Sequence, residues 1–341
     1  AIAAVVLVTV TGLLMLQLIR RSSTPTDDTT PVATAPPTTT ETPDTVVIGA
    51  ADDVVDLALA PDGRLWAATE SGVVVWDLET VSATVFSEND GLGGRSVDHV
   101  AVASDGTAWA IGDSWLARYD GGWTLLGDVD ADLLTPVGDM AIGPDGAAWI
   151  AAGGPDALVR VDTDGATTYA VPEGALLATP WARSIAVDAD GTVWASTWQS
   201  GVFAFDGEWQ HFGVDDGLPS EVVGNIAMAP DGAVWVGGDG LYGELGGDIP
   251  AGGILRYRDG TWTVYTTADG LLGNDGDVTV DPSGGVWVVH HALPDNVAEE
   301  LGVELPDGIS HFDGSEWRHY PGIDGRGPGV VTVDGTLWLP S

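Results

Sequence analysis

The residues with the clearest potential for chemistry are two adjacent histidines, His290 and His291, in a chain of 341 residues. With Asp275 or Asp277 nearby, either imidazole could act as a general base. Adjacent side chains of a strand point to opposite faces, so the two rings are not expected to hold one metal ion together. No Gly-x-Ser-x-Gly, His-Glu-x-x-His or phosphate-loop motif accompanies them. We therefore predict no catalytic residue, and a lyase- or hydrolase-type enzyme that uses His290 or His291 is the alternative.

A second group of residues could bind a ligand rather than react with it. Trp181 and Trp198 stand outside the regular tryptophan positions described below, and an aromatic ring with a polar rim suits a sugar or another small polar ligand. Packing beneath loops would also explain them. Two insertions, 239–253 and 290–307, should share one face, and insertions in a repeat array often mark its binding face. The predicted ligand-binding residues on this face are Arg95, Trp181, Arg183, Trp198, Gln199, Tyr242, Asn274, Asp275, His290 and His291.

An acidic run imitates a calcium loop. Residues 128–132 supply Asp at the first, third and fifth ligand positions, and Asp139 supplies the twelfth. Leu133 stands at the sixth position, where the sharp turn requires glycine. We interpret the run as a solvated acidic loop, and we predict neither a bound metal nor a cofactor. The chain has no cysteine, which excludes thiolate metal sites and disulfides.

Repeated hairpins are the elements that must position these residues. The stretch 184–194, SIAVDADGTVW, predicts two strands joined by a tight turn, because an Asp-Gly pair between apolar runs favours the type I′ hairpin. The same pattern, with Ser-Gly in one copy, recurs every 40 to 52 residues and leads each time to a tryptophan: Trp66, Trp109, Trp149, Trp194, Trp235, Trp287 and Trp338. A repeat of this length with strand and turn content is typical of propeller blades.

The predicted fold class is therefore all-β, a β-propeller of about seven four-stranded blades over residues 46–341. The repeated tryptophans should be core, because burying one removes roughly 200 Å² from water. Six blades show four strands each, whereas the last shows only two, 329–333 and 336–340. Either two further strands belong to a longer chain, or residues 45–49 (TVVIG) complete this blade and close the ring, which would hide the sheet edges.

The N-terminal residues 1–20 predict a transmembrane helix. Residues 1–19 are uncharged and almost wholly apolar, and as a helix they would span roughly 28 Å, close to a hydrocarbon core of about 30 Å. A signal-peptide core is the alternative. Residues 21–45 are rich in Ser, Thr and Pro and predict a disordered, extended linker. Such a stalk between an anchor and a β domain favours a single-pass protein of the cell membrane with an extracytoplasmic propeller.

The charge balance limits the possible partners. The chain carries 51 acidic and 11 basic residues, all of the latter arginine, for a net charge of −40. Binding a phosphate backbone needs clustered Lys and Arg, so we predict no nucleic-acid partner. The acidity also implies self-repulsion that salt would screen.

The repeat resembles that of the two-component regulator propeller family. The loop 216–219 (DGLP), the strand 226–229, the Asp231-Gly232 turn, the stretch 235–238 (WVGG) and the aromatic run Tyr257, Trp262 and Tyr265 carry the resemblance, which covers roughly residues 50–338. It implies a ligand-sensing or partner-binding module outside the membrane, with a glycan, another small molecule or a protein as partner. A more distant similarity to propellers of the streptogramin lyase type implies the enzyme alternative. A non-catalytic interaction platform is a third possibility.

Overall fold

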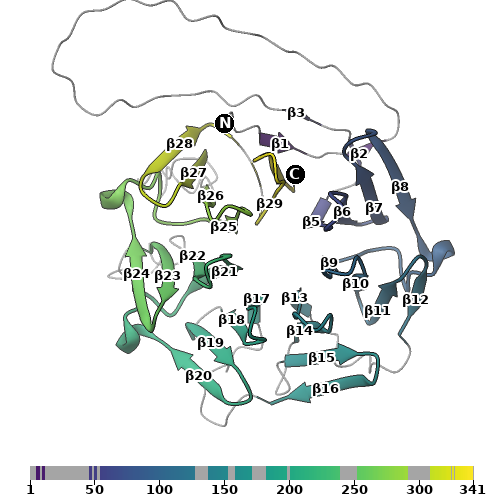
Figure 1. The fold of residues 1–341 in the computed structure, drawn as a ribbon, viewed down its shortest axis with the longest axis horizontal. Coiled ribbons are helices and arrows are strands. Elements are labelled where there is room, and N and C mark those ends of the chain that lie inside the picture. The colour runs from purple at the N-terminus through teal and green to yellow at the C-terminus, as the bar shows by residue number, and fades with distance from the viewer. Residues whose placement is uncertain are drawn as a thin grey trace, which may run out of the picture.

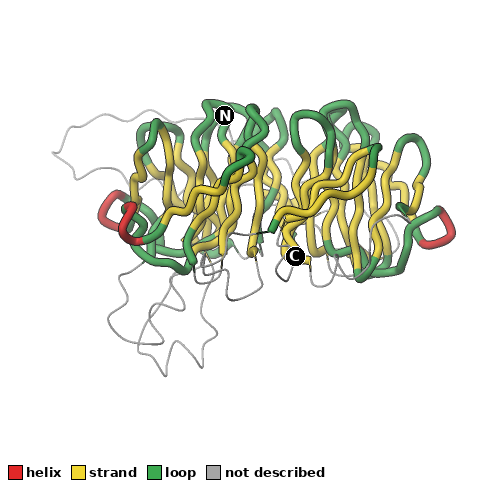
Figure 2. Tube along the Cα trace, turned by 90° about the horizontal axis from the view of Figure 1, so that it is seen from below, coloured by secondary structure: helices red, strands yellow, loops and turns green. Residues whose placement is uncertain are grey.

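The computed structural model describes residues 54–126, 137–152, 158–170, 182–197, 200–238, 252–290, 308–323, 325 and 327–340, together with four short strands nearer the N-terminus. Regular structure in these ranges is β-strand, apart from short 3-10 turns. The sheets are arranged around a common centre (Figure 1). In the side view the strands form one disc-like layer with loops above and below (Figure 2). The predicted all-β propeller is therefore confirmed.

Six blades each consist of four consecutive antiparallel strands. The innermost strand comes first in the chain and the outermost comes last (Figure 1). The strands of the six blades are β5 (Val54–Leu59), β6 (Leu65–Thr69), β7 (Gly72–Asp77) and β8 (Ser82–Phe86); β9 (His99–Val102), β10 (Ala108–Gly112), β11 (Trp115–Tyr119) and β12 (Trp123–Leu125); β13 (Val137–Ile142), β14 (Ala148–Ala152), β15 (Leu158–Asp162) and β16 (Gly165–Tyr169); β17 (Ala182–Val187), β18 (Val193–Thr197), β19 (Val202–Phe205) and β20 (Trp209–Phe212); β21 (Val223–Met228), β22 (Val234–Gly238), β23 (Ile254–Arg258) and β24 (Thr261–Tyr265); and β25 (Asp277–Val280), β26 (Val286–His290), β27 (Gly308–Phe312) and β28 (Trp317–Pro321).

The sheet that follows blade 6 is built differently. Its antiparallel hairpin, β29 (Val330–Val331) and β30 (Leu337–Leu339), is joined by two parallel strands from the N-terminal segment, β1 (Val5–Leu7) on β30 and β3 (Val46–Val47) on β1. One predicted closure used residues 45–49, and β3 does lie in this sheet, although beside β1 rather than beside β30. The prediction of about seven four-stranded blades, the last of them incomplete or closed by the N-terminal strand, is not confirmed, because only six are built from consecutive antiparallel strands in the described part of the chain.

The predicted transmembrane helix over residues 1–20 is not found. Among the described residues, no helix is long and apolar enough to cross a membrane. Within that segment the structure describes β1 and β2 (Val10–Thr11), both short strands, and β2 pairs with β4 (Ala50–Ala51). A valine-rich aliphatic run suits a strand as well as an apolar helix, and the edge of β30 offers it hydrogen bonds. The predicted linker, residues 21–45, lies outside the described residues.

The repeated tryptophans form the core, as predicted. Each lies on the second strand of its sheet, and all seven are between 1% and 7% exposed. They join neighbouring blades: the ring of Trp66 in blade 1 lies 5.3 Å from the ring of Tyr119 and 6.1 Å from that of Trp123, both in blade 2. A blade therefore buries its faces only with the help of its neighbours, which explains why the units assemble around a centre.

Candidate functional site

The structure describes half of the ten predicted ligand-binding residues. These are Arg95, Arg183, Asn274, Asp275 and His290; the others, Trp181, Trp198, Gln199, Tyr242 and His291, lie outside the described residues. In each blade the loop between the second and third strands and the connection to the next blade leave the same face. The described candidates lie on or beside such connections. We refer to this side of the disc as the loop face.

Asp275 and His290 come together at the loop face of blade 6. Asp275 precedes β25 and is 5% exposed, and His290 ends β26 and is 2% exposed. Asp275 Oδ1 lies 3.9 Å from His290 Nδ1, which is too far for a direct hydrogen bond. Among the described residues, neither of these two buried atoms has a hydrogen-bond partner. Burying such atoms unpaired is costly, so the gap between them is suited to a polar group that bonds to both.

Gly273 keeps the space beside this pair open. A Cβ atom at this position would lie 3.0 Å from Asp275 Oδ1 and 3.1 Å from His290 Nδ1. A side chain at position 273 would press against both polar atoms, so the space beside the pair depends on glycine here.

On its other side, His290 is bonded to residues that the sequence did not single out. His290 Nε2 lies 2.8 Å from Ser310 Oγ, which in turn lies 3.3 Å from His319 Nδ1 and accepts a hydrogen bond of 3.1 Å from the N–H of Leu272. A hydroxyl carries one proton, so Ser310 donates to one ring and accepts from the other. The carboxylate of Asp275 favours a proton on the facing Nδ1 of His290, and Ser310 then donates to Nε2. The four side chains form a polar chain through blade 6.

His319 lies at the more accessible end of this chain. Burial, and secondarily the charge of His290 when it is protonated, lowers the pKa of His319. Ser310 is fully buried, so its hydroxyl is not presented as an open nucleophile. Strand alternation could have identified both residues: Ser310 is directly opposite His319 and Val288 in register, and Val288 shares a face with His290.

The remaining described candidates have separate roles. Asn274 Oδ1 accepts the N–H of Thr267 at 2.8 Å and so supports the 3-10 turn Thr267–Asp269. Arg95 lies 3.4 Å from Ser71 Oγ at the junction of blades 1 and 2. Arg183 lies on β17 and is half-buried. Asp277, the other predicted partner of the histidines, is opposite Val289 in register. Within the described residues, the structure therefore brings together only Asp275 and His290, and a ligand site there remains a prediction.

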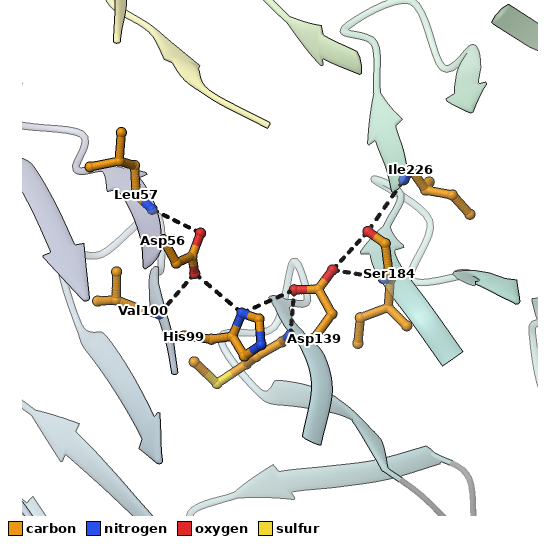
Figure 3. A network of polar contacts seen from close by, with 9 residues as sticks. Asp56, Leu57, His99, Val100, Asp139, Ser184 and Ile226 are labelled. Atoms are coloured by element: carbon orange, nitrogen blue, oxygen red, sulfur yellow. Dashed lines mark hydrogen bonds and ion pairs between the residues drawn. The ribbon is translucent and has the colours of Figure 1, made fainter. Parts of the chain in front are cut away.

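The described residues contain no group of three or more His, Asp or Glu side chains that could hold a metal ion. Residues 128–132, the acidic run that imitates a calcium loop, lie outside the described part. Asp139, placed in the sequence pattern as its twelfth ligand, instead lies on the innermost strand of blade 3 and faces the centre of the disc (Figure 3).

Asp139 belongs to a ring of polar residues that the sequence reading did not identify. Each stands seven residues before the glycine of its hairpin turn: Asp56, His99, Asp139, Ser184, Asn225 and Asp277. Four of these side chains accept a hydrogen bond from the next blade in the ring. The donor in each case is the backbone N–H of the residue that directly follows a ring residue. The bonds are Val100 to Asp56 (3.0 Å), Ile185 to Asp139 (2.9 Å), Ile226 to Ser184 (3.2 Å) and Val278 to Asn225 (2.8 Å). Each innermost strand is a sheet edge, so these side chains satisfy N–H groups that would otherwise be unpaired. We call this ring the central seam.

His99 joins the seam between two carboxylates (Figure 3). Its Nδ1 atom lies 3.5 Å from Asp56 Oδ2 and 3.7 Å from Asp139 Oδ1. Burial lowers the pKa of His99, but the hydrogen bond to Asp56 and the charges of Asp139 and Asp56 outweigh burial and raise that pKa to about 9. Burial also raises the pKa of Asp139, partly offset by the positive His99.

A cavity of about 480 Å³ lies at the centre of the disc, lined in part by Asp56, Asp139, Ser184 and Asn225. These side chains already bond to neighbouring blades, so we interpret their polarity as a requirement of assembly. The Asp275 and His290 pair differs, because two of its polar atoms have no hydrogen-bond partner among the residues that the structure describes.

The fold and the central seam define the chain as a β-propeller. No family model matches the chain, and no curated protein matches it, so the resemblance to two-component regulator propeller repeats is not established at the family level. Solved structures do match. The extracellular domain of the proposed hybrid two-component system BT3049 from B. thetaiotaomicron is 17% identical with a TM-score of 0.64; the match covers 86% of this chain but only 38% of that domain.

Two lyases have similar structures. Streptogramin B lyase is 14% identical, with a TM-score of 0.60 over 85% of this chain and 91% of the lyase. Virginiamycin B lyase from Staphylococcus aureus is 15% identical, with a TM-score of 0.58 over 81% of this chain and 88% of the enzyme. Similarity at this level of identity shows the propeller fold, which a sensor domain and an enzyme share.

Proposed function

We propose that this chain is a ligand-sensing or partner-binding propeller module that takes a small polar ligand, such as a saccharide, at the loop face of blade 6. The observation that carries the proposal is the buried pair Asp275 and His290, whose facing Oδ1 and Nδ1 atoms lie 3.9 Å apart and find no hydrogen-bond partner in the part of the chain that the structure describes. A ligand hydroxyl can donate a hydrogen bond to the carboxylate of Asp275 and at the same time accept one from Nδ1–H of His290. Gly273 leaves room beside the two atoms.

The placement of the module outside the cytoplasm is part of the same proposal. It is supported by the Ser-, Thr- and Pro-rich composition of residues 21–45. The fold is similar to that of an extracellular domain of a two-component system, which is consistent with sensing. A protein partner at the loop face is compatible with the same chemistry.

An enzyme of the lyase type is the second candidate function. The observation that favours it is His290 itself, which has a carboxylate on one side and the Ser310 hydroxyl at 2.8 Å on the other. Such an arrangement can hold a general base in one tautomer. Binding is favoured over catalysis, because His290 and Ser310 are almost completely buried and the hydroxyl is already bonded to Leu272 and the two rings.

A binding experiment separates these possibilities. Calorimetric titrations with neutral and acidic mono- and disaccharides should identify a ligand for the wild-type protein. Asp275→Asn and His290→Gln should then weaken its binding about tenfold or more, since each removes a charged or donating group from a buried site. His211→Gln is the control, because His211 is an exposed histidine of blade 4 whose ring contacts the carbonyl of Ser200 and not blade 6.

The proposal is wrong if both blade 6 variants bind the saccharide as the wild type does while their thermal unfolding is unchanged. If the saccharide is instead converted, product formation that disappears in His290→Gln would favour the enzyme.

A further inference from the structure

Within the described residues, three blades hold an arginine over their repeated tryptophan. The residue opposite the tryptophan on the third strand supplies the guanidinium, which lies 5.9, 5.9 and 5.4 Å from the ring centroid in the pairs Arg118 with Trp109, Arg160 with Trp149, and Arg256 with Trp235. A cation at this distance from an aromatic face is held by the ring's quadrupole. The arrangement recurs in blades 2, 3 and 5.

Aspartates complete the arrangement. In blade 3, Arg160 lies 2.6 Å from Asp145, in the hairpin turn, and also contacts Asp162, two residues further along its own strand. In blade 5, Arg256 lies 3.1 Å from Asp231 of the corresponding turn. The repeated unit is thus a tryptophan ring with a guanidinium over it and a carboxylate beside it.

Blade 1 retains the ring and the carboxylates but has no arginine at the register position opposite the tryptophan. Trp66 is opposite Val75 in register, so valine stands where the other blades have arginine. Asp62 occupies the hairpin turn and Asp77 lies two residues beyond Val75, as Asp145 and Asp162 do in blade 3. Valine is shorter than arginine and uncharged, which leaves both space and negative charge at this place.

A pocket of about 240 Å³ lies there, lined by Arg64, Trp66, Val75, Asp77, Ser82, Thr84, Phe86 and Tyr119. Three of these residues are aromatic and contact one another: the ring centroids of Trp66 and Tyr119 are 5.3 Å apart, and those of Phe86 and Tyr119 are 5.4 Å apart. Trp66 and Val75 are buried, whereas Tyr119 and Phe86 are partly exposed. The pocket combines aromatic walls with exposed hydroxyls, one carboxylate and the guanidinium of Arg64.

The local charge favours a cation. Arg64, which also lines the pocket, is paired with Asp62 at 2.6 Å. The two carboxylates of Asp62 and Asp77 and this one guanidinium sum to −1, so the place carries a net negative charge. Two backbone N–H groups, of Glu79 and Thr80, donate to Asp77 Oδ1 at 3.0 and 2.8 Å, and Oδ2 lies outside these two bonds. Hydrogen bonds from Thr80 lower the pKa of Asp77, so it is ionised at neutral pH.

We propose that this pocket binds a small organic cation with a guanidinium group, which takes the place that the arginine side chain takes in blades 2, 3 and 5. The ligand's planar donors bond to Asp77 and to the hydroxyls of Ser82 and Thr84, while its face lies against the aromatic walls. The pocket is built from blades 1 and 2 and is independent of the site proposed at the loop face of blade 6.

Methylguanidinium is the probe, at millimolar concentrations far below those that denature proteins. The indole N–H signals of the tryptophans are followed by NMR during the titration, and Trp66→Phe identifies the signal of Trp66. We expect a saturable shift at Trp66 and none at Trp109, whose ring already carries Arg118. Methylurea, a neutral molecule of the same shape, should leave the Trp66 signal unchanged.

Two variants test the mechanism. Val75→Arg should fill the pocket with the protein's own guanidinium and abolish the methylguanidinium shift while thermal unfolding stays the same or moves to higher temperature. Asp77→Asn should weaken binding about tenfold, whereas Asp120→Asn, at the same position in blade 2, should not change it.

Three results would overturn the proposal. They are the absence of a saturable shift at Trp66, an equal response to methylurea, and undiminished binding in a folded Val75→Arg protein.

Discussion

His99 Nδ1 in blade 2 lies 3.5 Å from Asp56 Oδ2 in blade 1, and Asp139 of blade 3 approaches the same nitrogen at 3.7 Å. One imidazole thus links three blades at the centre of the disc. The contact places a titratable group in the central seam, and it makes the stability of the propeller dependent on pH.

The first prediction concerns that dependence. Because the pKa of His99 is raised from 6.5 to about 9 in the folded protein, the folded state binds the proton more tightly than the unfolded state. The stabilisation is complete below about pH 6.5 and is lost as pH rises toward 9, by at most about 3 kcal/mol at 1.36 kcal/mol per unit. The groups that face His99 are Asp56, Asp139 and Asp98.

Urea unfolding at several pH values between 6 and 9.5 measures this loss. His99→Gln should be less stable at pH 6 and should show a flatter profile, whereas His211→Gln should keep the wild-type slope. A slope in His99→Gln equal to that of the wild type would contradict the role of this histidine.

A second prediction concerns Asn225, which completes the seam between blades 5 and 6. Its side chain accepts the N–H of Val278 and donates to the carbonyl of the same residue, each at 2.8 Å. Asn225→Ala leaves both backbone groups unpaired and should destabilise the protein by about 2–4 kcal/mol. Asn89→Ala, in an exposed turn, is the control and should change the free energy of unfolding by less than about 0.5 kcal/mol.

The third prediction concerns Arg160 over Trp149. Arg160→Ala removes the cation from the ring and its contacts with Asp145 and Asp162, and should cost about 1–2 kcal/mol. Arg160→Lys should recover less than half of this loss, because an ammonium cannot bond to two carboxylates with a planar fork. Equal stability of the Lys variant and the wild type, measured by urea unfolding, would mean that charge alone matters.

A fourth prediction follows from the net charge of −40. Raising NaCl from about 10 mM to 1 M should increase the unfolding temperature, most steeply below about 150 mM, because salt screens the mutual repulsion of the carboxylates. Near the isoelectric point of about 4.1 this dependence should flatten. A salt dependence of the same size at both pH values would exclude charge repulsion as its cause.

Local patterns allowed much of the fold to be predicted. Asp-Gly turns and the repeated tryptophans define six blades, because turn chemistry and strand alternation depend on neighbours in the sequence. The last sheet was predicted less well, since the pairing of Val5–Leu7 with β30 joins segments more than 300 residues apart. An apolar segment does not reveal in its own sequence which sheet edge it meets.

The candidate sites show the same limit. Asp275 and His290 were predicted from residue type, but Ser310 and His319 were missed because no motif marks them and only the strand register brings them to His290. Asp139 was assigned to an imitation of a calcium loop, although its spacing of seven residues from the turn glycine Gly146 identifies it as a seam residue. Aligning the repeats by their glycines, rather than by their tryptophans alone, would have revealed the seam.

The proposed ligand site at Asp275 and His290 is tested most directly by the side-chain ¹⁵N signals of the histidines, recorded with and without the best-binding saccharide. We predict that the ligand shifts the Nδ1 signal of His290, which faces Asp275, and leaves both signals of His211 unchanged. A saccharide that binds saturably without moving either nitrogen signal of His290, or a complete set of saccharides that leaves His290 unperturbed, would contradict the account.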